Sequence, residues 1–417
     1  MKKTIIILTA LLLASNGMKA QQQTFQQYMQ QVLQHNLSYK AAQLELQAAQ
    51  EDLVAARKFS DPVLSAGYSN NSDWDILMGQ SMSVELSKSF SLGKRAARKQ
   101  VAQHTLEASQ ATLNDFTLAL QTEAAQAFAD ALLARELAAV GHEAWENMQS
   151  LYVSDSLRAA NGDISPLDVL QSRLEATMAL QDYRTLTTDY RNSLLTLDRF
   201  MGNPTQGTTQ VVGELLQHNE QYSLQTLLDS AIVWRQDLSA ARRMAQAAQS
   251  EVVSVRRERM PDLDLSLGAE YNTRVRNEEA PAPEFIGYSA GLSIPLPVSN
   301  LNRGEVRASQ VRAQQAEIEA ENMRAQIQME VMQAYNNYEN ARQQMTDYNQ
   351  FLMGNARQML DGKIYAYQHG ETSLLEVINA QHTYNELRQS YYTCIHATTS
   401  AWLALLRAAG HPLPSHL

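Results

Sequence analysis

The chain has 417 residues, with 34 Lys and Arg against 44 Asp and Glu and a formal net charge of −10. An acidic chain without a basic patch does not suit a nucleic-acid-binding protein. The single cysteine, Cys394, excludes an intramolecular disulfide. Only 19% of residues are charged, while Gln and Ala are plentiful, and this composition is typical of long packed helices.

Residues 1–20 are predicted to be a signal peptide. Lys2 and Lys3 form its basic start, and cleavage is expected after Ala20. Its apolar stretch is too short for a membrane-spanning helix, which needs about 20 residues. Removing the peptide takes away three of the 34 basic residues and no acid, so the mature chain is more acidic still.

Hydrophobic periodicity predicts a helix over residues 24–59 and a matching helix over residues 223–260. Each contains Ala-Ala-Gln, and in each a proline follows the glutamine after 12 residues, from Gln50 to Pro62 and from Gln249 to Pro261. These prolines are expected to end the two helices.

Residues 62–92 and 261–297 contain four predicted strands with strict alternation. Within residues 64–69, for example, Leu, Ala and Tyr alternate with Ser, Gly and Ser. An isolated hairpin of this kind fits a soluble sandwich with one buried face. Four strands cannot close on themselves, however, because a small barrel needs about eight. The pattern therefore predicts lipid-facing strands of a barrel completed by other copies of the chain.

Two stretches of 67 residues, 94–160 and 303–369, contain no proline and predict helices about 100 Å long. Gly141 and Gly354 are the candidate interruptions. Shorter helices return over residues 165–201 and 373–409. Helices of this length cannot surround one globular core, so we expect an extended coiled-coil wall.

The chain is duplicated, because residues 162–204 align with residues 370–412 at a constant offset of 208 without a gap. The predicted first repeat covers residues 21–204 and includes the helical hairpin 94–201. The second covers residues 205–417 and includes the hairpin 302–409.

At both hairpin turns the sequence reads Gly-x-x-Ser-x-x-acid-Val. Ser165 and Ser373 are predicted N-caps, and Asp168 and Glu376 are expected to complete capping boxes. The glycine that opens each turn suits a left-handed helix end.

The duplicated order and these two turns resemble the TolC-type outer-membrane factor family over essentially the whole mature chain. Short loops and overall size look most like the branch that serves heavy-metal efflux pumps. The resemblance implies a mainly α fold with a small β part. Duplicated long-helix hairpins would form an α-helical barrel, and four strands per chain would enter a trimeric transmembrane β-barrel. The chain would lie in the outer membrane of a Gram-negative bacterium, with a periplasmic helical extension.

The implied function is the channel of a tripartite efflux system. A homotrimer in outer-membrane lipid would meet a periplasmic adaptor protein and an inner-membrane pump, commonly of the resistance-nodulation-division type. The hairpin turns would contact the adaptor through Gly162, Ser165, Leu167, Gly370, Ser373 and Leu375. No catalysis, cofactor or nucleic acid is expected.

In the resembled family the second turn also closes the tunnel. The first acid of the closing ring falls on Glu376, whereas the second falls on Asn379 and departs from the pattern. The linking tyrosine matches Tyr367, with Asp168 as its expected acidic partner. The basic residue of this lock falls on Thr372, so that link is absent or rebuilt.

Other functions fit the sequence less well. The nine His are scattered, the Met residues of the second long helix share no face, and neither pattern predicts a metal site. A type I protein-secretion duct would use the same architecture with another pump. A soluble periplasmic coiled-coil adaptor would need one hairpin rather than two.

Overall fold

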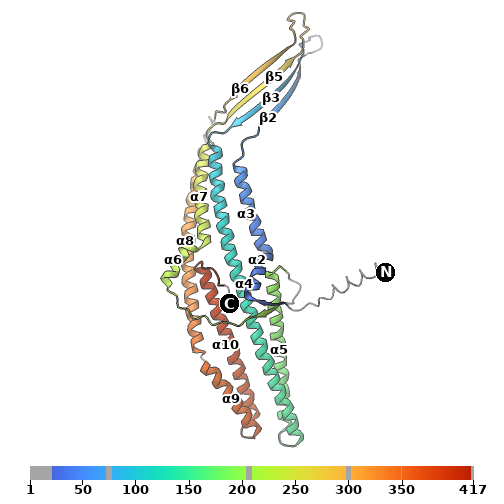
Figure 1. The fold of residues 1–417 in the computed structure, drawn as a ribbon, viewed down its shortest axis with the longest axis vertical. Helices are drawn as coiled ribbons and strands as arrows, with labels where there is room; N and C mark the ends of the chain where they lie inside the picture. Colours follow the sequence, from blue (N-terminus) through green and yellow to red (C-terminus); the bar gives the residue numbers. More distant parts are fainter. Residues whose placement is uncertain (1–20, 72–77, 203–208, 297–301, 349, 415–417) are drawn as a thin grey trace, which may run out of the picture. The chain divides into compact units, whose positions relative to one another are not determined.

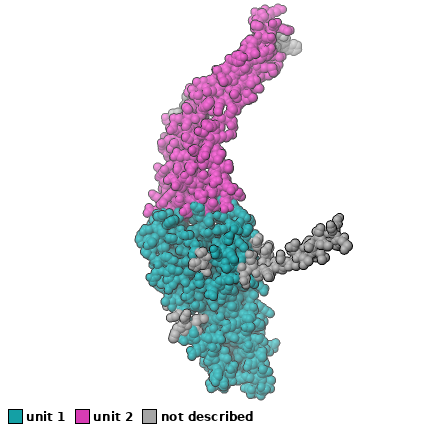
Figure 2. All heavy atoms as spheres, viewed as in Figure 1, with its two compact units in different colours: residues 1–42, 114–235, 325–417 teal, residues 43–113, 236–324 magenta. Residues whose placement is uncertain are grey.

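The computed structural model describes residues 21–71, 78–202, 209–296, 302–348 and 350–414. The predicted signal peptide lies outside them. The chain divides into two compact units (Figure 2). Unit 1 contains residues 1–42, 114–235 and 325–417, and unit 2 contains residues 43–113 and 236–324. Each unit therefore combines segments from both predicted repeats.

The elements follow the same order in both halves (Figure 1). The first half contains β1 (Gln21–Thr24), α2 (Phe25–His35), α3 (Leu37–Ala56), β2 (Val63–Asn70), β3 (Gln80–Phe90), α4 (Lys94–Ala160) and α5 (Pro166–Phe200). The second contains β4 (Thr209–Val212), α6 (Leu224–Trp234), α7 (Gln236–Arg257), β5 (Leu263–Asn272), β6 (Phe285–Ser293), α8 (Arg303–Asp347), α9 (Gln350–Gln368) and α10 (Leu374–Ala408).

Unit 2 contains a four-stranded antiparallel sheet in the order β2-β3-β5-β6. Its register sets Leu64, Leu86 and Leu267 in one row across three strands. A row of polar or small residues, such as Ser65, Glu85 and Gly268, points to the other face because neighbouring side chains alternate. The apolar face is exposed along the strands, and its large exposed members are Val84, Leu64, Tyr68, Met82, Leu86, Leu265, Leu267, Tyr271, Ile286, Tyr288 and Leu292.

The last strand is shorter than its alternation predicts, since β6 ends at Ser293. Pro295 follows two residues later and lacks the N–H that a sheet ladder needs. Among the described residues, the structure contains no helix with the length and apolar character needed to cross a bilayer. A short parallel pair, β1 with β4, has no counterpart in the sequence prediction.

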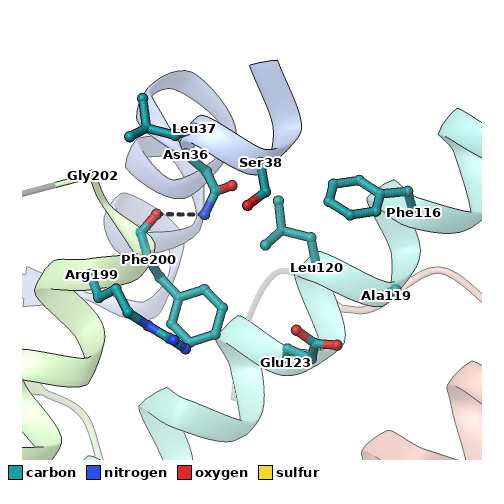
Figure 3. A pocket seen from close by; sticks show the side chains of 10 residues that line it. All are labelled: Asn36, Leu37, Ser38, Phe116, Ala119, Leu120, Glu123, Arg199, Phe200 and Gly202. Atoms are coloured by element: carbon teal, nitrogen blue, oxygen red, sulfur yellow. Dashed lines mark hydrogen bonds between the residues drawn. The ribbon is translucent and has the colours of Figure 1, made fainter. Parts of the chain in front are cut away.

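The two shorter helices are each broken once, where periodicity predicted continuity. The first breaks at Asn36 and the second at Arg235. Asn36 caps the start of α3, because its Oδ1 accepts a hydrogen bond from the Tyr39 N–H at 3.0 Å. Its Nδ2 donates to the Phe200 carbonyl at the end of α5 (Figure 3). In the second half Arg235 Nη1 donates to the Ala408 carbonyl at the end of α10. The residue at each break therefore forms a hydrogen bond to the end of a return helix.

A cavity of about 510 Å³ lies beside the first of these joints (Figure 3). Phe116, Leu120 and Phe200 give it an apolar lining, and Glu123 and Arg199 add one charge of each sign. In the second half Arg235 also pairs with Glu330 at 2.8 Å. The two joints therefore share their backbone geometry, but the joining side chain is neutral at Asn36 and charged at Arg235.

Helix α4 runs from Lys94 to Ala160 without a break, as its lack of proline predicted. Gly141 does not interrupt it. A Cβ at Gly141 would lie 2.7 Å from Leu186 Cδ1, so the glycine lets α4 and α5 approach closely. The second long helix is broken, but at Asp347 rather than at the predicted Gly354. Residues 346–349 read Thr-Asp-Tyr-Asn, four consecutive residues of low helix propensity.

Candidate functional site at the ends of the helical hairpins

Both hairpin turns, in unit 1, have the capped geometry that the sequence predicted. Gly162 and Gly370 end the outgoing helices with φ of 84° and 74°, values at which a Cβ is strained. Ser165 Oγ accepts a hydrogen bond from the Leu167 N–H at 3.1 Å. Ser373 Oγ accepts one from the Glu376 N–H at 3.4 Å. The serines therefore cap α5 and α10.

Neither turn forms the capping box that was predicted. No hydrogen bond joins the N–H of Ser165 to Asp168, or that of Ser373 to Glu376, within the described part of the chain. The Glu376 carboxylate instead accepts hydrogen bonds from Lys363 Nζ and from Thr372 Oγ1, the latter at 2.8 Å. The hydrogen bond from Lys363 and then that from Thr372 lower the pKa of Glu376. This acid is therefore charged and held within its own hairpin.

Tyr367 joins the second hairpin to the first, but its partner differs from the predicted Asp168. Its hydroxyl donates to Asp155 Oδ1 at 2.9 Å, and Asp155 is fully buried. Asp155 lies on the last turns of α4, whereas Asp168 opens α5 on the far side of the turn. Asp168 still lies close enough for its charge to add to the raised pKa of Tyr367, after burial and Asp155.

A basic residue, Arg158, lies beside Tyr367, whereas the family resemblance placed the base at position 372, which is Thr in this chain. Its guanidinium carbon lies 4.9 Å from the centre of the Tyr367 ring, on the same helix as Asp155. Burial raises the pKa of Asp155, although hydrogen bonding by Tyr367 and Ser172 and the charge of Arg158 oppose that rise. A basic residue of the first hairpin therefore lies beside Tyr367 in this structure.

Apolar packing fixes the tyrosine. Tyr367, Leu374, Val377 and Ile378 form one buried cluster at the turn between α9 and α10. Leu151 of α4 packs against it, so the cluster also spans the two hairpins. This packing holds the Tyr367 hydroxyl where it meets the buried carboxylate.

A second polar contact joins the hairpins through Glu143 of α4. Its carboxylate accepts hydrogen bonds from Arg388 of α10 and from Arg357 of α9, the latter at 3.1 Å. Both guanidiniums also lie near the Tyr384 ring, at 5.6 Å and 5.5 Å from its centre. Burial alone would raise the pKa of Glu143, but the two arginines outweigh it and lower that pKa.

Two histidines of α10 add further ties between the hairpins. His382 Nε2 lies 3.3 Å from Glu175 of α5, and His396 Nε2 lies 2.6 Å from Asp130 of α4. Sequence reasoning missed these pairs and the Glu143 contact. Their members lie more than 200 residues apart, so no local spacing signals them.

The remaining predicted site residues are exposed. Asn379 lies one turn after Glu376 on α10 with its side chain exposed. Leu167 and Leu375 stand beside the two caps with 74% and 56% of their surface exposed. In the described residues, no group of three or more His, Cys, Asp or Glu gathers in a way that could hold a metal.

Comparison with known proteins decides the family. The family model described as outer membrane efflux protein matches residues 28–203 and 227–411, once in each predicted repeat. The chain belongs to that family. It is a channel component of tripartite efflux systems in the outer membrane, with a helical part in the periplasm. Family membership implies a trimeric channel that works with an adaptor and an inner-membrane pump.

Individual relatives support this assignment. The cobalt-zinc-cadmium resistance protein CzcC of Cupriavidus metallidurans is 24% identical over 379 residues, covering 90% of this chain and 87% of CzcC. The structure of CusC shares the fold, with a TM-score of 0.75, 20% identity and coverage of 93% of this chain and 92% of that one. The open-state MtrE outer membrane channel of Neisseria gonorrhoeae has a TM-score of 0.75 at 15% identity, covering 94% of this chain and 90% of that one.

Proposed function

We propose that this channel exports heavy-metal cations and works with a pump of the resistance-nodulation-division type. The likeness to CzcC over nine-tenths of the chain carries this proposal. The net charge of −10 is compatible with a water-filled path that cations enter. Selection among cations would rest with the pump, and the channel would supply the route through the periplasm and the outer membrane.

Deletion of the gene tests the substrate class. A strain without the protein should grow less well in zinc, cobalt or cadmium and should accumulate the metal. A plasmid copy should restore both. Unchanged metal tolerance, with lower tolerance of lipophilic drugs, would contradict metal export. Loss of a secreted protein alone would instead favour the type I duct.

Three copies of the chain form the proposed conduit. Twelve strands would complete one barrel, because four strands leave an unclosed sheet with an exposed apolar face. The paired hairpins would surround the periplasmic part of the path. The exposed tips at Gly162, Ser165, Leu167, Gly370, Ser373 and Leu375 would contact the adaptor.

The ends of the hairpins form the proposed gate. The Tyr367–Asp155 contact holds the second hairpin against the first, and Glu376 of three copies would set a ring of charge at the opening. Moving the second hairpin outward would break the Tyr367 contact. Asn379 would give the next level of the opening a neutral polar ring in place of a second acidic one.

Single-channel currents in planar bilayers test the gate. Tyr367→Phe should raise conductance, because the phenylalanine cannot donate to Asp155. The matched control is Tyr365→Phe, since Tyr365 is exposed two residues away on the same helix. Glu376→Gln should lower cation preference. Equal currents from the Tyr367 and Tyr365 variants would place the gate elsewhere.

A further inference from the structure

A polar cavity of about 220 Å³ lies between the two hairpins within unit 1. Gly141 and Met148 of α4 line one part of it. Glu175 and Asp182 come from α5, and Glu386 comes from α10. None of the described residues that line the cavity is a Lys or an Arg. Carboxylates of both hairpins therefore border one space that no basic side chain shares.

These acids lack the positive partners that join the hairpins elsewhere. Glu143 pairs with two arginines, but Asp182 and Glu386 form no ion pair in the described part of the chain. The partner of Glu175 is His382, whose Nε2 lies 3.3 Å from the carboxylate. Like charges on two packed helices repel each other. The carboxylates of α5 and α10 therefore disfavour contact between the hairpins unless a cation lies between them.

The duplicated fold does not itself require these acids. At the offset of 208 that aligns α5 with α10, Thr383 stands at the position of Glu175. Ser390 stands at the position of Asp182 in the same alignment. The counterpart of the third acid is Met178. Each acid therefore has an uncharged residue at the matching position of the other return helix, so the packing of such a helix does not need a carboxylate there.

A buried amide on the cavity wall is a second, independent sign of a ligand. Gln381 lines the cavity and is only 2% exposed. Its Nε2 donates to Asn385 Oδ1 at 2.9 Å, but its Oε1 has no hydrogen-bond partner among the described residues. A buried acceptor without a donor is unfavourable, and native proteins rarely leave one unmatched. A water molecule held by a cation would donate to this oxygen.

Size and the types of acceptor favour a hydrated divalent cation. Six waters of about 30 Å³ each fill about 180 Å³, which is close to the volume of the cavity. Magnesium keeps several of its waters and is bound through one or two carboxylates. Zinc instead takes nitrogen or sulfur ligands directly. His382 is the single imidazole on the wall, and the described residues contain no group of three or more direct ligands.

We propose that this cavity binds a hydrated divalent cation of the magnesium type, one in each chain. The waters of the ion donate to the carboxylates of Asp182 and Glu386 and to Gln381 Oε1. The ion cancels the repulsion between α5 and α10, so it holds the second hairpin against the first. This contact is separate from the Tyr367–Asp155 hydrogen bond, and it does not depend on which substrate the channel exports.

Thermal unfolding of the detergent-solubilised protein tests the site. The protein is treated with EDTA, dialysed and unfolded in rising magnesium chloride at constant ionic strength, so that screening by salt stays equal. The unfolding midpoint should rise by about 2 °C or more between zero and about 10 mM magnesium. Asp182→Asn with Glu386→Gln should abolish this rise. In EDTA the same variant should unfold at a higher temperature than the wild type, because the repulsion is gone.

The matched control is Asp189→Asn with Glu371→Gln, which removes the same charge from exposed acids that do not line the cavity. It should keep the magnesium-dependent rise. An equal rise in the control and in the cavity variant, or no rise in the wild type, would overturn the site.

A single substitution separates a hydrated ion from a directly bound metal. His382→Gln should keep the response to magnesium, because the ion meets the protein through its waters. Stabilisation by micromolar zinc that requires His382, without any response to magnesium, would overturn the proposal in favour of direct coordination. Calorimetric titration of the wild type with magnesium should show about one site per chain, and the cavity variant should show none.

Discussion

At the residue scale, the buried carboxylate of Asp155 predicts an unusual pH dependence. Burial raises its folded-state pKa above the ordinary value of about 4. The folded state then binds a proton more tightly than the unfolded state does. This contribution to stability is complete below the unfolded pKa and is lost as pH rises through the folded pKa. The charged form of Asp155 therefore lowers the stability of the folded state at neutral pH.

Asp155→Asn removes this titration and keeps an oxygen that accepts from Tyr367. We expect the variant to gain thermal stability over the wild type as pH rises from about 4 to 7. Unfolding of the detergent-solubilised protein across that range measures the difference. Asp163→Asn is the control, because Asp163 lies in the same turn but does not contribute to the raised pKa of Asp155 or of Tyr367. Parallel curves for Asp155→Asn and wild type would show that the buried carboxyl does not titrate in this window.

Glu143 predicts a pH dependence of stability opposite in sign to that of Asp155. Its folded-state pKa is lowered, because the arginines outweigh burial. Its contribution to the stability of the folded state is therefore present above the unfolded pKa and is lost as pH falls through the folded pKa. Glu143→Gln should lower the free energy of unfolding by about 1 kcal/mol at pH 7, because the contact is partly exposed, and by little in acid. Glu146→Gln is the matched control on the same helix, because Glu146 pairs with His142 at 3.5 Å and contacts neither Arg357 nor Arg388 among the described residues. An equal loss in both variants would remove any special role for Glu143.

At the element scale, two glycines of the second hairpin predict opposite effects of one substitution. Gly354 lies inside α9 and Gly370 ends the turn after it, and a Cβ at either meets open space. Only Gly370 has a positive φ, of 74°. Gly354→Ala should stabilise the protein by about 0.5–1 kcal/mol, and Gly370→Ala should destabilise it by about 1 kcal/mol. Thermal unfolding compares them directly, and a shift in the same direction for both would refute the backbone explanation.

Local elements were predictable where one segment carries the whole signal. The caps at Ser165 and Ser373, the unbroken α4 and the apolar strand rows all follow from local pattern. The breaks at Asn36 and Arg235 were missed, because their side chains bond to carbonyls more than 160 residues away. Tyr367 was predicted as the link, but its partner was not, since Asp155 and Asp168 lie near the same turn and only packing selects between them.

At the scale of the whole molecule, the proposed adaptor contact and the proposed channel closure would use different residues of the same hairpin ends. The proposed closing contact is buried, with the Tyr367 hydroxyl on Asp155 beside an apolar cluster. Leu167 and Leu375 are exposed beside the caps and take no part in that cluster. Export should therefore be separable from conductance by substitution at the exposed leucines.

Leu167→Glu and Leu375→Glu, made separately, should each lower metal tolerance at least tenfold while leaving single-channel conductance unchanged. The physical reason is that a charge replaces an apolar contact at the tip, where the adaptor would desolvate it, but nothing buried is disturbed. Leu167→Met and Leu375→Met should keep export, because they keep the apolar surface. Co-purification with the adaptor should follow the same order as export. Full export from the glutamate variants would show that the tips are not the docking surface, and altered conductance would show that the tips and the gate are coupled after all.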